Sequence, residues 1–274
     1  MRISREALIL NIYLRELKAN AKGLLLWLLW LIVLIAAGMG KFAGAENSSQ
    51  SVNAIMEAMP DVILAMFGMN GLDLDTIEGY YGVISFLVLI MAAIHSGMLG
   101  SVIIAKEERD KTSEFLFVRP VTRTSVITSK IFAALTNVVL FNLLSFLTSW
   151  IIAKTVAKGS SLSSIMLNIS VGMLLIQLLF LFMGTCLASG LKESGKASGI
   201  TTGVVLVSYI TYIISDMDER FRFLKVLTPF KYFEPASIIN GAGLETIYVA
   251  ILLILTALFI IATYIFFQKR DLNS

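Results

Sequence analysis

The sequence predicts an all-α integral membrane protein with six transmembrane helices, and three observations lead to this fold class. Of the 274 residues, 57% are hydrophobic and only 15% are charged, so the chain lacks the polar surface of a water-soluble domain. Six apolar runs are each long enough to cross a bilayer as helix, which takes about 20 residues. All four prolines fall between these runs, where a missing N–H costs no hydrogen bond in lipid.

The apolar runs divide the chain into an N-terminal segment and a membrane domain. The predicted spans are residues 24–43, 82–104, 126–153, 165–190, 197–215 and 246–268. We therefore expect two units, a cytoplasmic interfacial helix over residues 1–23 and a six-span domain over residues 24–274. The two longest segments on the other side of the membrane, 44–81 and 216–245, mix apolar clusters with glycine, proline and aromatic residues, which predicts short extracellular helices at the membrane surface.

The N-terminal segment has the spacing of an amphipathic helix. One apolar stripe recurs at helical intervals and consists of Ile3, Ala7, Leu10, Leu14 and Leu17. The charged side chains that lie away from this stripe are Arg5, Glu6, Arg15, Glu16 and Lys18. This pattern predicts a helix that lies in the cytoplasmic membrane interface before the first span.

Charge predicts the orientation of the spans. With the N-terminus in the cytoplasm, 15 of the 22 Lys and Arg residues fall in cytoplasmic segments, and six spans return the C-terminus to the same side. The acidic residues have the opposite bias, with 8 of 19 inside. This distribution follows the positive-inside rule. We expect a multi-pass protein of the plasma membrane, in contact with lipid and not with nucleic acid, with both termini in the cytoplasm.

A dense polar patch, KEERDKTSEFLFVRPVTR, occupies residues 106–123 between the second and third spans. Every residue from Lys106 to Glu114 is charged or carries a hydroxyl, and four apolar residues follow. Residues 106–118 can form about three helical turns, with Glu107 and Lys111 at i,i+4 spacing. Pro120 then ends the helix, and Thr122 or Thr124 can cap the third span. From charge alone, an ordinary solvated loop is an equally good interpretation.

This patch resembles the first cytoplasmic loop of ABC-2-type transporter permeases. The positions that match the family pattern are Glu107, Glu108, Thr112, Glu114, Leu116, Pro120, Thr122, Arg123 and Lys130. Lys111 stands where many members have glycine. Weaker similarities occur in MPDVILAMFGMNGLDLDTIEGYYG, in LTPFKYFEPASIINGAG and in FQKRDL near the end of the chain, so the resemblance covers nearly the whole sequence.

The resemblance implies that the patch contains a coupling helix, which docks on a separate ATP-binding subunit. The residues that would form the docking surface are Glu107, Glu108, Lys111, Thr112, Glu114, Phe115, Leu116, Pro120 and Arg123. The chain would bind no cofactor itself, because ATP and Mg²⁺ would be held by two copies of the partner ATPase. A second permease chain, either an identical copy or a sister permease, would complete the translocation pathway.

The sequence offers no catalytic or metal-binding set of its own. GLKESGKAS, at residues 190–198, spaces Gly190, Gly195 and Lys196 as in a phosphate-binding loop, but position 197 is Ala where a Mg²⁺-binding hydroxyl is needed. The chain has one histidine, His95, and one cysteine, Cys186. These are too few for a metal site that needs several histidine or cysteine ligands, and no catalytic set of side chains is evident. We therefore expect that the chain is not an enzyme.

Four polar side chains fall at membrane depth, namely His95, Asn137, Asn142 and Gln177. Polar groups at this depth face the bundle interior or a water-filled path. They can serve as interhelical hydrogen bonds, worth roughly 0.6 kcal/mol each. They are also the candidate residues that line a substrate pathway.

Two functions remain open at this point. The resemblance implies the permease subunit of an ATP-driven exporter, which forms half of a pathway for a peptide, drug or other amphipathic substrate. The alternative is a stand-alone membrane protein, such as an assembly factor, sensor or channel, that needs no ATPase. A neighbouring reading frame that encodes a soluble ATPase would separate the two.

Overall fold

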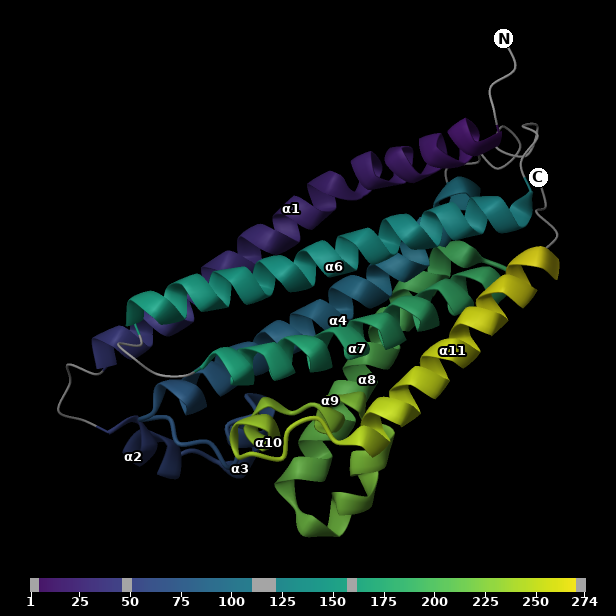
Figure 1. Ribbon diagram of the computed structural model, residues 1–274. Coiled ribbons are helices and arrows are strands. Elements are labelled where there is room, and N and C mark those ends of the chain that lie inside the picture. The colour runs from purple at the N-terminus through teal and green to yellow at the C-terminus, as the bar shows by residue number, and fades with distance from the viewer. Residues whose placement is uncertain (1–4, 46–50, 110–121, 157–161, 270–274) are drawn as a thin grey trace.

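The computed structural model describes residues 5–45, 51–109, 122–156 and 162–269, and these residues form helices joined by turns, with no strand among them (Figure 1). The long helices are α1 (Arg5–Ala45), α4 (Ile77–Arg109), α6 (Arg123–Val156), α7 (Ser163–Gly190), α8 (Ala197–Met217) and α11 (Thr246–Lys269). The short helices are α2 (Val52–Glu57), α3 (Asp61–Met66), α9 (Pro229–Tyr232) and α10 (Pro235–Ile239), with the 3₁₀ segments η1 (Ser194–Lys196) and η2 (Glu219–Leu227).

The six predicted spans are confirmed. Each predicted apolar run lies within one of the six long helices, and all six helices are long and apolar enough to cross a membrane. The 33 residues of α4 extend over about 50 Å, well beyond a hydrocarbon core of about 30 Å. Helix α4 therefore continues past the hydrocarbon core at its ends.

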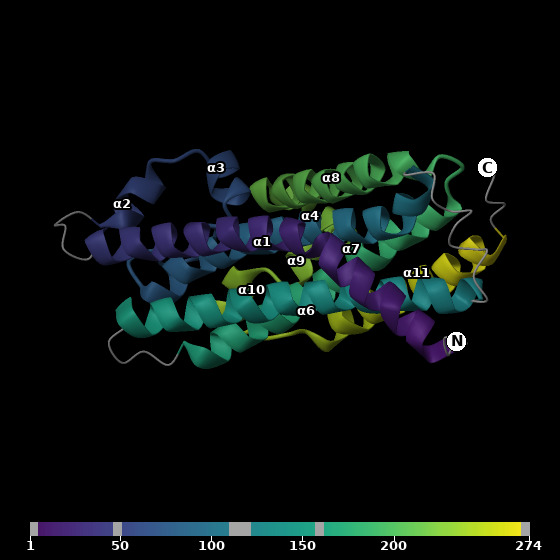
Figure 2. The same ribbon diagram turned by 90° about the horizontal axis from the view of Figure 1, so that it is seen from above.

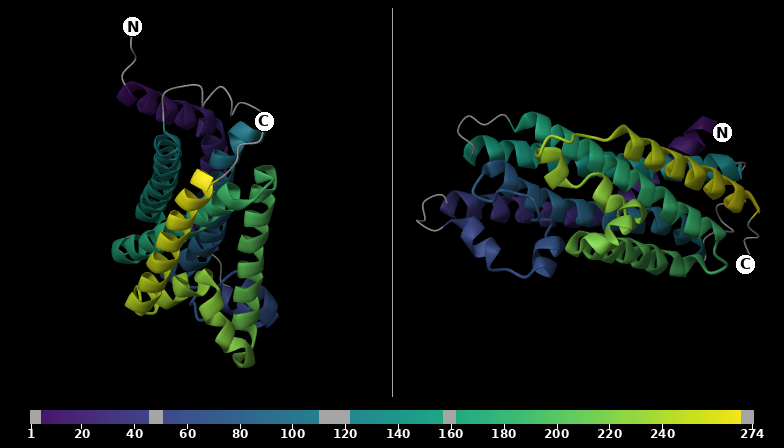
Figure 3. Two further views of the ribbon diagram at one scale, coloured as in Figure 1. Left: turned by 90° about the vertical axis from the view of Figure 1, so that its right-hand side faces the viewer. Right: turned by 90° about the horizontal axis from the view of Figure 1, so that it is seen from below.

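The N-terminal segment and the first span form one continuous helix. The sequence predicts an interfacial helix over residues 1–23, and α1 runs without interruption for 41 residues, with its N-terminal part turned at an angle to the rest (Figures 2 and 3). That this part lies in the membrane interface stays a prediction. The junction KANAKG contains no proline, and its lysine and alanine residues favour helix, so nothing there ends α1. Leu10 and Leu14, from the predicted apolar stripe, are exposed, while Ile12 and Glu16 on the other side are buried against the bundle.

Helix α4 lies at the centre of the bundle, between α1, α7 and α8 (Figure 2). It packs most extensively on α7, where two glycines allow the backbones to meet. A Cβ on Gly100 would lie 2.1 Å from the carbonyl oxygen of Leu181, and one on Gly184 would lie 2.4 Å from that of Gly97. Gly97 and Gly100 of α4 therefore serve close helix packing.

The bundle has two different ends, and we name them by what they hold. At the terminal end, α1 begins and α11 ends, and α4 stops next to the start of α6 (Figure 1). At the cap end, the segment between α8 and α11 folds into η2, α9 and α10, with α2 and α3 beside them (Figures 1 and 3). Short helices therefore occur in both segments for which the sequence predicts them, residues 44–81 and 216–245.

The six spans are covered to very different extents. In the most apolar window of α4, 67% of the residues are buried, against 22% in α1 and α8 and 17% in α11. The uncovered residues of these three helices are large and apolar, for example Trp30, Val207 and Ile254. Such faces are stable only in contact with lipid or with another protein chain.

Candidate functional site

The charged patch between α4 and α6 is the first candidate site, and the structure describes its two borders. Helix α4 continues through Glu107 and Glu108 and ends at Arg109. The other predicted docking residues in the patch, Lys111, Thr112, Glu114, Phe115, Leu116 and Pro120, lie outside the described residues. A coupling helix over residues 106–118 therefore stays a prediction.

The far border of the patch is anchored at the terminal end. Thr122 caps α6 as predicted, because its hydroxyl oxygen accepts the backbone N–H of Ser125 at 3.2 Å. Arg123, the first residue of α6, donates from Nη1 to the carbonyl oxygen of Gln268 at 3.3 Å. The side chain of Gln268 in turn donates to Thr124 at 3.4 Å, so the start of α6 is joined to the end of α11.

A cluster of charged side chains connects both borders of the patch to α1, and we call it the terminal cluster. It consists of Arg15 and Glu16 of α1, Lys106 of α4 and Lys130 of α6. Glu16 is completely buried; its Oε1 lies 3.0 Å from Arg15 Nη2 and 3.6 Å from Lys130 Nζ, and its Oε2 lies 3.6 Å from Lys106 Nζ. Lys130, only 1% exposed, also donates to the carbonyl oxygen of Ile103 at 2.6 Å.

Sequence reasoning missed the terminal cluster, although one signal pointed to it. Lys130 lies inside the predicted third span, and a charged group at such a position requires a partner. Nothing local identifies Glu16 as that partner, because the two residues are far apart in the sequence and Glu16 belongs to the polar side of an amphipathic helix. Only the packing of α1 against α4 and α6 brings them together.

His95 is buried among aromatic rings near the centre of the bundle. Its ring stacks on Phe141 with centroids 4.9 Å apart and meets Trp27 edge-on at 5.5 Å. Its Nδ1 has no hydrogen-bond partner within the described part of the chain. His95 therefore joins α1, α4 and α6 through ring contacts.

Two of the other three membrane-depth residues bind each other. Asn142 of α6 donates to Gln177 Oε1 at 3.2 Å and to the carbonyl oxygen of Ser170 at 3.0 Å, and the Ser170 hydroxyl donates to Asn142 Oδ1 at 2.6 Å. These bonds join α6 to α7. Asn137 instead donates to the carbonyl oxygen of Ala133 in its own helix at 2.8 Å. That these residues and His95 line a pathway stays a prediction.

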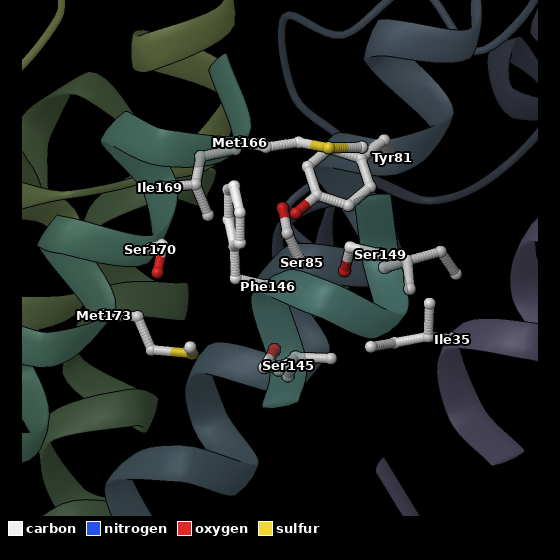
Figure 4. A pocket seen from close by; sticks show the side chains of 12 residues that line it. Ile35, Tyr81, Ser85, Ser145, Phe146, Ser149, Met166, Ile169, Ser170 and Met173 are labelled. Carbon is white, nitrogen blue, oxygen red and sulfur yellow. The ribbon is translucent and has the colours of Figure 1, made fainter. Parts of the chain in front are cut away.

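A small cavity lies between α1, α4, α6 and α7, and its lining includes Ser170, the residue that hydrogen-bonds to Asn142 (Figure 4). Its hydroxyl-bearing lining residues are Tyr81, Ser85, Ser145, Ser149 and Ser170. Figure 4 shows the hydroxyl of Tyr81 close to that of Ser85, with Ser149 facing the same space. The cavity measures about 10 Å³, room for about one water molecule. Sequence reasoning missed these serines, although Ser145 and Ser149 are one helical turn apart in an apolar run.

A second buried group of charges lies at the opposite end of the molecule, and we call it the cap cluster. It consists of Asn70, Tyr212, Asp216, Lys231 and Glu234. Lys231 Nζ lies 2.6 Å from Asp216 Oδ1 and 2.6 Å from Glu234 Oε2. The Tyr212 hydroxyl donates to Glu234 Oε1 at 2.6 Å, and Asn70 donates to Asp216 Oδ2 at 2.7 Å. The cluster joins α8, α9 and the α9–α10 turn to the turn before α4.

The electrostatics of the cap cluster favour a charged lysine. Burial alone lowers the pKa of Lys231, but the carboxylates of Glu234 and Asp216 outweigh this effect and raise its pKa above the usual 10.5. A fixed positive charge therefore lies between two carboxylates at every pH near neutrality.

The segment that resembles a phosphate-binding loop forms a turn. Gly190 ends α7, Lys196 lies in η1 next to the start of α8, and an exposed ion pair joins Lys196 to Glu193 at 2.8 Å. Position 197 begins a membrane helix and supplies no hydroxyl. Among the residues that the structure describes, no three His, Cys, Asp or Glu side chains are grouped so that they could hold a metal ion.

Comparison with known proteins agrees with the six-span architecture. A family model described as ABC-2 family transporter protein matches residues 10–272, from α1 to beyond the end of α11. No curated protein matches the chain. Because the matched region includes nearly every residue, all six spans and the charged patch, the chain is a multi-pass membrane protein that belongs to the ABC-2 family of transporter proteins.

Proposed function

We propose that this chain is the permease subunit of an ATP-driven exporter and forms half of its translocation pathway. The observation that carries the proposal is the charged patch at residues 106–123, in a chain matched by the family from residue 10 to residue 272. A patch at the terminal end, between two helices that reach into the core, is well positioned to receive force from a soluble partner. ATP and Mg²⁺ would be bound by that partner, a separate ATPase subunit present in two copies.

The proposed orientation places the terminal end in the cytoplasm of a cell whose plasma membrane holds the protein. The distribution of Lys and Arg supports this orientation, since 15 of 22 belong to segments at that end. The charged patch and both termini then face the cytoplasm, where ATP is available. The cap end faces outward, where the substrate would be released.

The coupling mechanism follows from the two helices that border the patch. Closure of the ATPase subunits on ATP would push residues 106–118, and α4 and α6 would carry the displacement into the bundle. Helix α4 packs on α1, α6, α7 and α8, so it can distribute the movement to most of the spans. A second permease chain, identical or related, would cover exposed apolar faces such as those of α1 and α8 and close the pathway.

The proposed substrate is a peptide, a drug or another flexible amphipathic molecule. Large apolar side chains remain exposed around the cap end, including Met66, Phe67, Phe221 and Phe223. These residues favour contact with an amphipathic molecule that leaves the bundle. Reconstituted complex tested against peptides, drugs and lipids should hydrolyse ATP faster only with its true substrate class.

Docking of the ATPase is tested by co-purification of the chain with the soluble ATPases of its own cell. Glu114→Arg reverses a charge at the centre of the patch and should abolish the complex, because docking surfaces of this kind depend on charge complementarity. Glu193→Arg is the matched control, since Glu193 is exposed in a different turn at the same end. It should leave the complex intact.

The same experiment decides between the two functions. If no ATPase co-purifies with the wild-type chain, the stand-alone membrane protein is the better account. An intact complex with Glu114→Arg would show that docking occurs elsewhere on the surface.

A further inference from the structure

The most unusual group at the terminal end is the carboxylate of Glu16. It is completely buried, it belongs to α1, and its two charge partners in other helices are Lys106 and Lys130. Taking a carboxylate out of water is costly unless opposite charges remain close to it. The position of α1 at this level is therefore constrained by both lysines at once.

The two lysines border the charged patch on either side. Lys106 lies in the last turn of α4, and Lys130 lies in the second turn of α6. Any displacement of the patch must move at least one of these helix ends. Because both face one carboxylate, α1 is drawn along with them.

The length of α1 connects the Glu16 contacts at the terminal end to the core of the bundle. The helix continues without a break from Arg5 to Ala45, so a displacement at Glu16 is passed along it to residues such as Leu31 and Ile35 in the core. Helix α1 packs on α6 and α4 along one side, where Leu28, Leu31, Ile35 and Met39 are buried, while its opposite side is exposed. One further bond to α6 joins the Tyr13 hydroxyl to Thr136 at 3.0 Å.

We propose that Glu16 is a positioning residue for energy coupling, which makes α1 move together with the two helices that receive force at the charged patch. The inference rests on the proposed function. It adds a role for α1, which is not one of the two helices that flank the patch. Glu16 acts through Lys106 and Lys130 and touches neither nucleotide nor substrate.

The first arm of the test uses the chain alone. Spin labels at Leu14→Cys in α1 and Phe132→Cys in α6, in a Cys186→Ser background, report the distance between the two helices. Both label positions are exposed. Glu16→Gln should broaden this distance distribution, Glu16→Asp should broaden it less, and Glu193→Gln should leave it unchanged.

The second arm uses the reconstituted complex with its ATPase. Glu16→Gln should retain the bound ATPase, because the patch itself is unaltered. The change in ATP hydrolysis that the wild-type chain causes, relative to the isolated ATPase, should fall roughly fivefold or more. A merely structural role would instead lower complex formation and activity together.

Should Glu16→Gln fail to fold, Lys106→Gln replaces it, because Lys106 is 26% exposed and Glu16 keeps Lys130 as a partner. This variant should also broaden the distance distribution and lower the hydrolysis response, each to a smaller extent. Unchanged hydrolysis in a well-folded Glu16→Gln complex would overturn the inference and leave the proposed function standing. A distance distribution that does not broaden would also overturn it. A wild-type chain that binds no ATPase would overturn the proposed function first, and this inference with it.

Discussion

The terminal cluster and the cap cluster both bury charge, but they pair it differently. At the cap end, Lys231 lies 2.6 Å from each of two carboxylates, and a tyrosine hydroxyl and an asparagine amide complete the hydrogen bonding. At the terminal end, Glu16 lies 3.6 Å from each of two lysines, and its Oε2 has no hydrogen-bond partner in the described residues. The cap network is closely hydrogen-bonded throughout. In the terminal cluster the neighbouring Arg15 hydrogen-bonds to Glu16, at 3.0 Å, and the two lysines from other helices act by charge at a longer distance.

This difference suggests different mechanical roles for the two ends. Coulomb attraction falls only by roughly a quarter between 2.6 and 3.6 Å, whereas a hydrogen bond weakens steeply with distance and angle. The cap cluster therefore holds one geometry, while the terminal cluster can keep its attraction during small displacements. We expect a rigid cap and a terminal end that can shift without losing its connection to α1.

The largest effect is expected when the cap cluster loses its cation. Lys231→Met leaves the buried carboxylates of Asp216 and Glu234 facing each other without a positive charge, and it should cost about 3–5 kcal/mol of the unfolding free energy. Chemical unfolding in detergent micelles measures this loss. A loss below about 1 kcal/mol would mean that the cap cluster contributes little to stability, and would contradict its role as the more rigid of the two clusters.

The corresponding change at the terminal end should cost less. Lys130→Met leaves Glu16 with Arg15 and Lys106 as partners, and Lys106 is 26% exposed, so water can share the charge. We expect a loss of about 2 kcal/mol in the same unfolding assay. Lys130→Arg, which keeps the charge, is the control. A loss larger than that of Lys231→Met would reverse the order of the two clusters.

Removal of a single hydroxyl from the cap cluster tests its hydrogen bonding apart from its charge. Tyr212→Phe deletes the donor to Glu234 Oε1 and keeps the ring against Phe86. Since the acceptor is ionised, the cost should be about 1.5 kcal/mol. In a double-mutant cycle with Glu234→Met, which removes the acceptor, most of this cost should disappear; simple additivity would contradict the bond.

The smallest effect concerns alkaline pH. The pKa of Lys231 is raised above 10.5, so its contribution to stability is complete below the unfolded value and is lost only as pH rises through the higher folded value. The stability difference between wild type and Lys231→Met should therefore stay constant from about pH 8 to about pH 10 and decline above that range. Thermal unfolding across this range provides the measurement, and a decline that begins near pH 8 would contradict it.

Local sequence patterns predicted the spans because each span carries its own signal. An apolar run of about 20 residues must be helical in lipid, whatever the rest of the chain does. The N-cap at Thr122 also follows from residues near each other in the sequence, whereas the close packing at Gly100 is against Leu181 of α7. The continuity of α1 was missed because a change from charged to apolar residues marks a membrane boundary without ending a helix.

The two ion clusters could not be predicted in the same way. Glu16 and Lys130 come from different helices, and Tyr212 of α8 meets Glu234 of the α9–α10 turn. Single-sequence patterns contain no information on which of these elements face each other. Lys231 and Glu234 are close in the sequence, at i,i+3 spacing in LTPFKYFEP, but their pairing was not predicted either. The burial of Glu16 could not be predicted without knowledge of how α1 packs against α4 and α6.

The central claim is that the patch between α4 and α6 binds an ATPase at the terminal end. A photoreactive residue in place of Phe115, at the centre of the patch, tests it most directly, with Phe223 as the matched position because Phe223 is 68% exposed at the cap end. Illumination of the co-expressed complex should attach the ATPase to the chain at position 115 and not at position 223. Crosslinking at position 223, or none at position 115, would contradict the account.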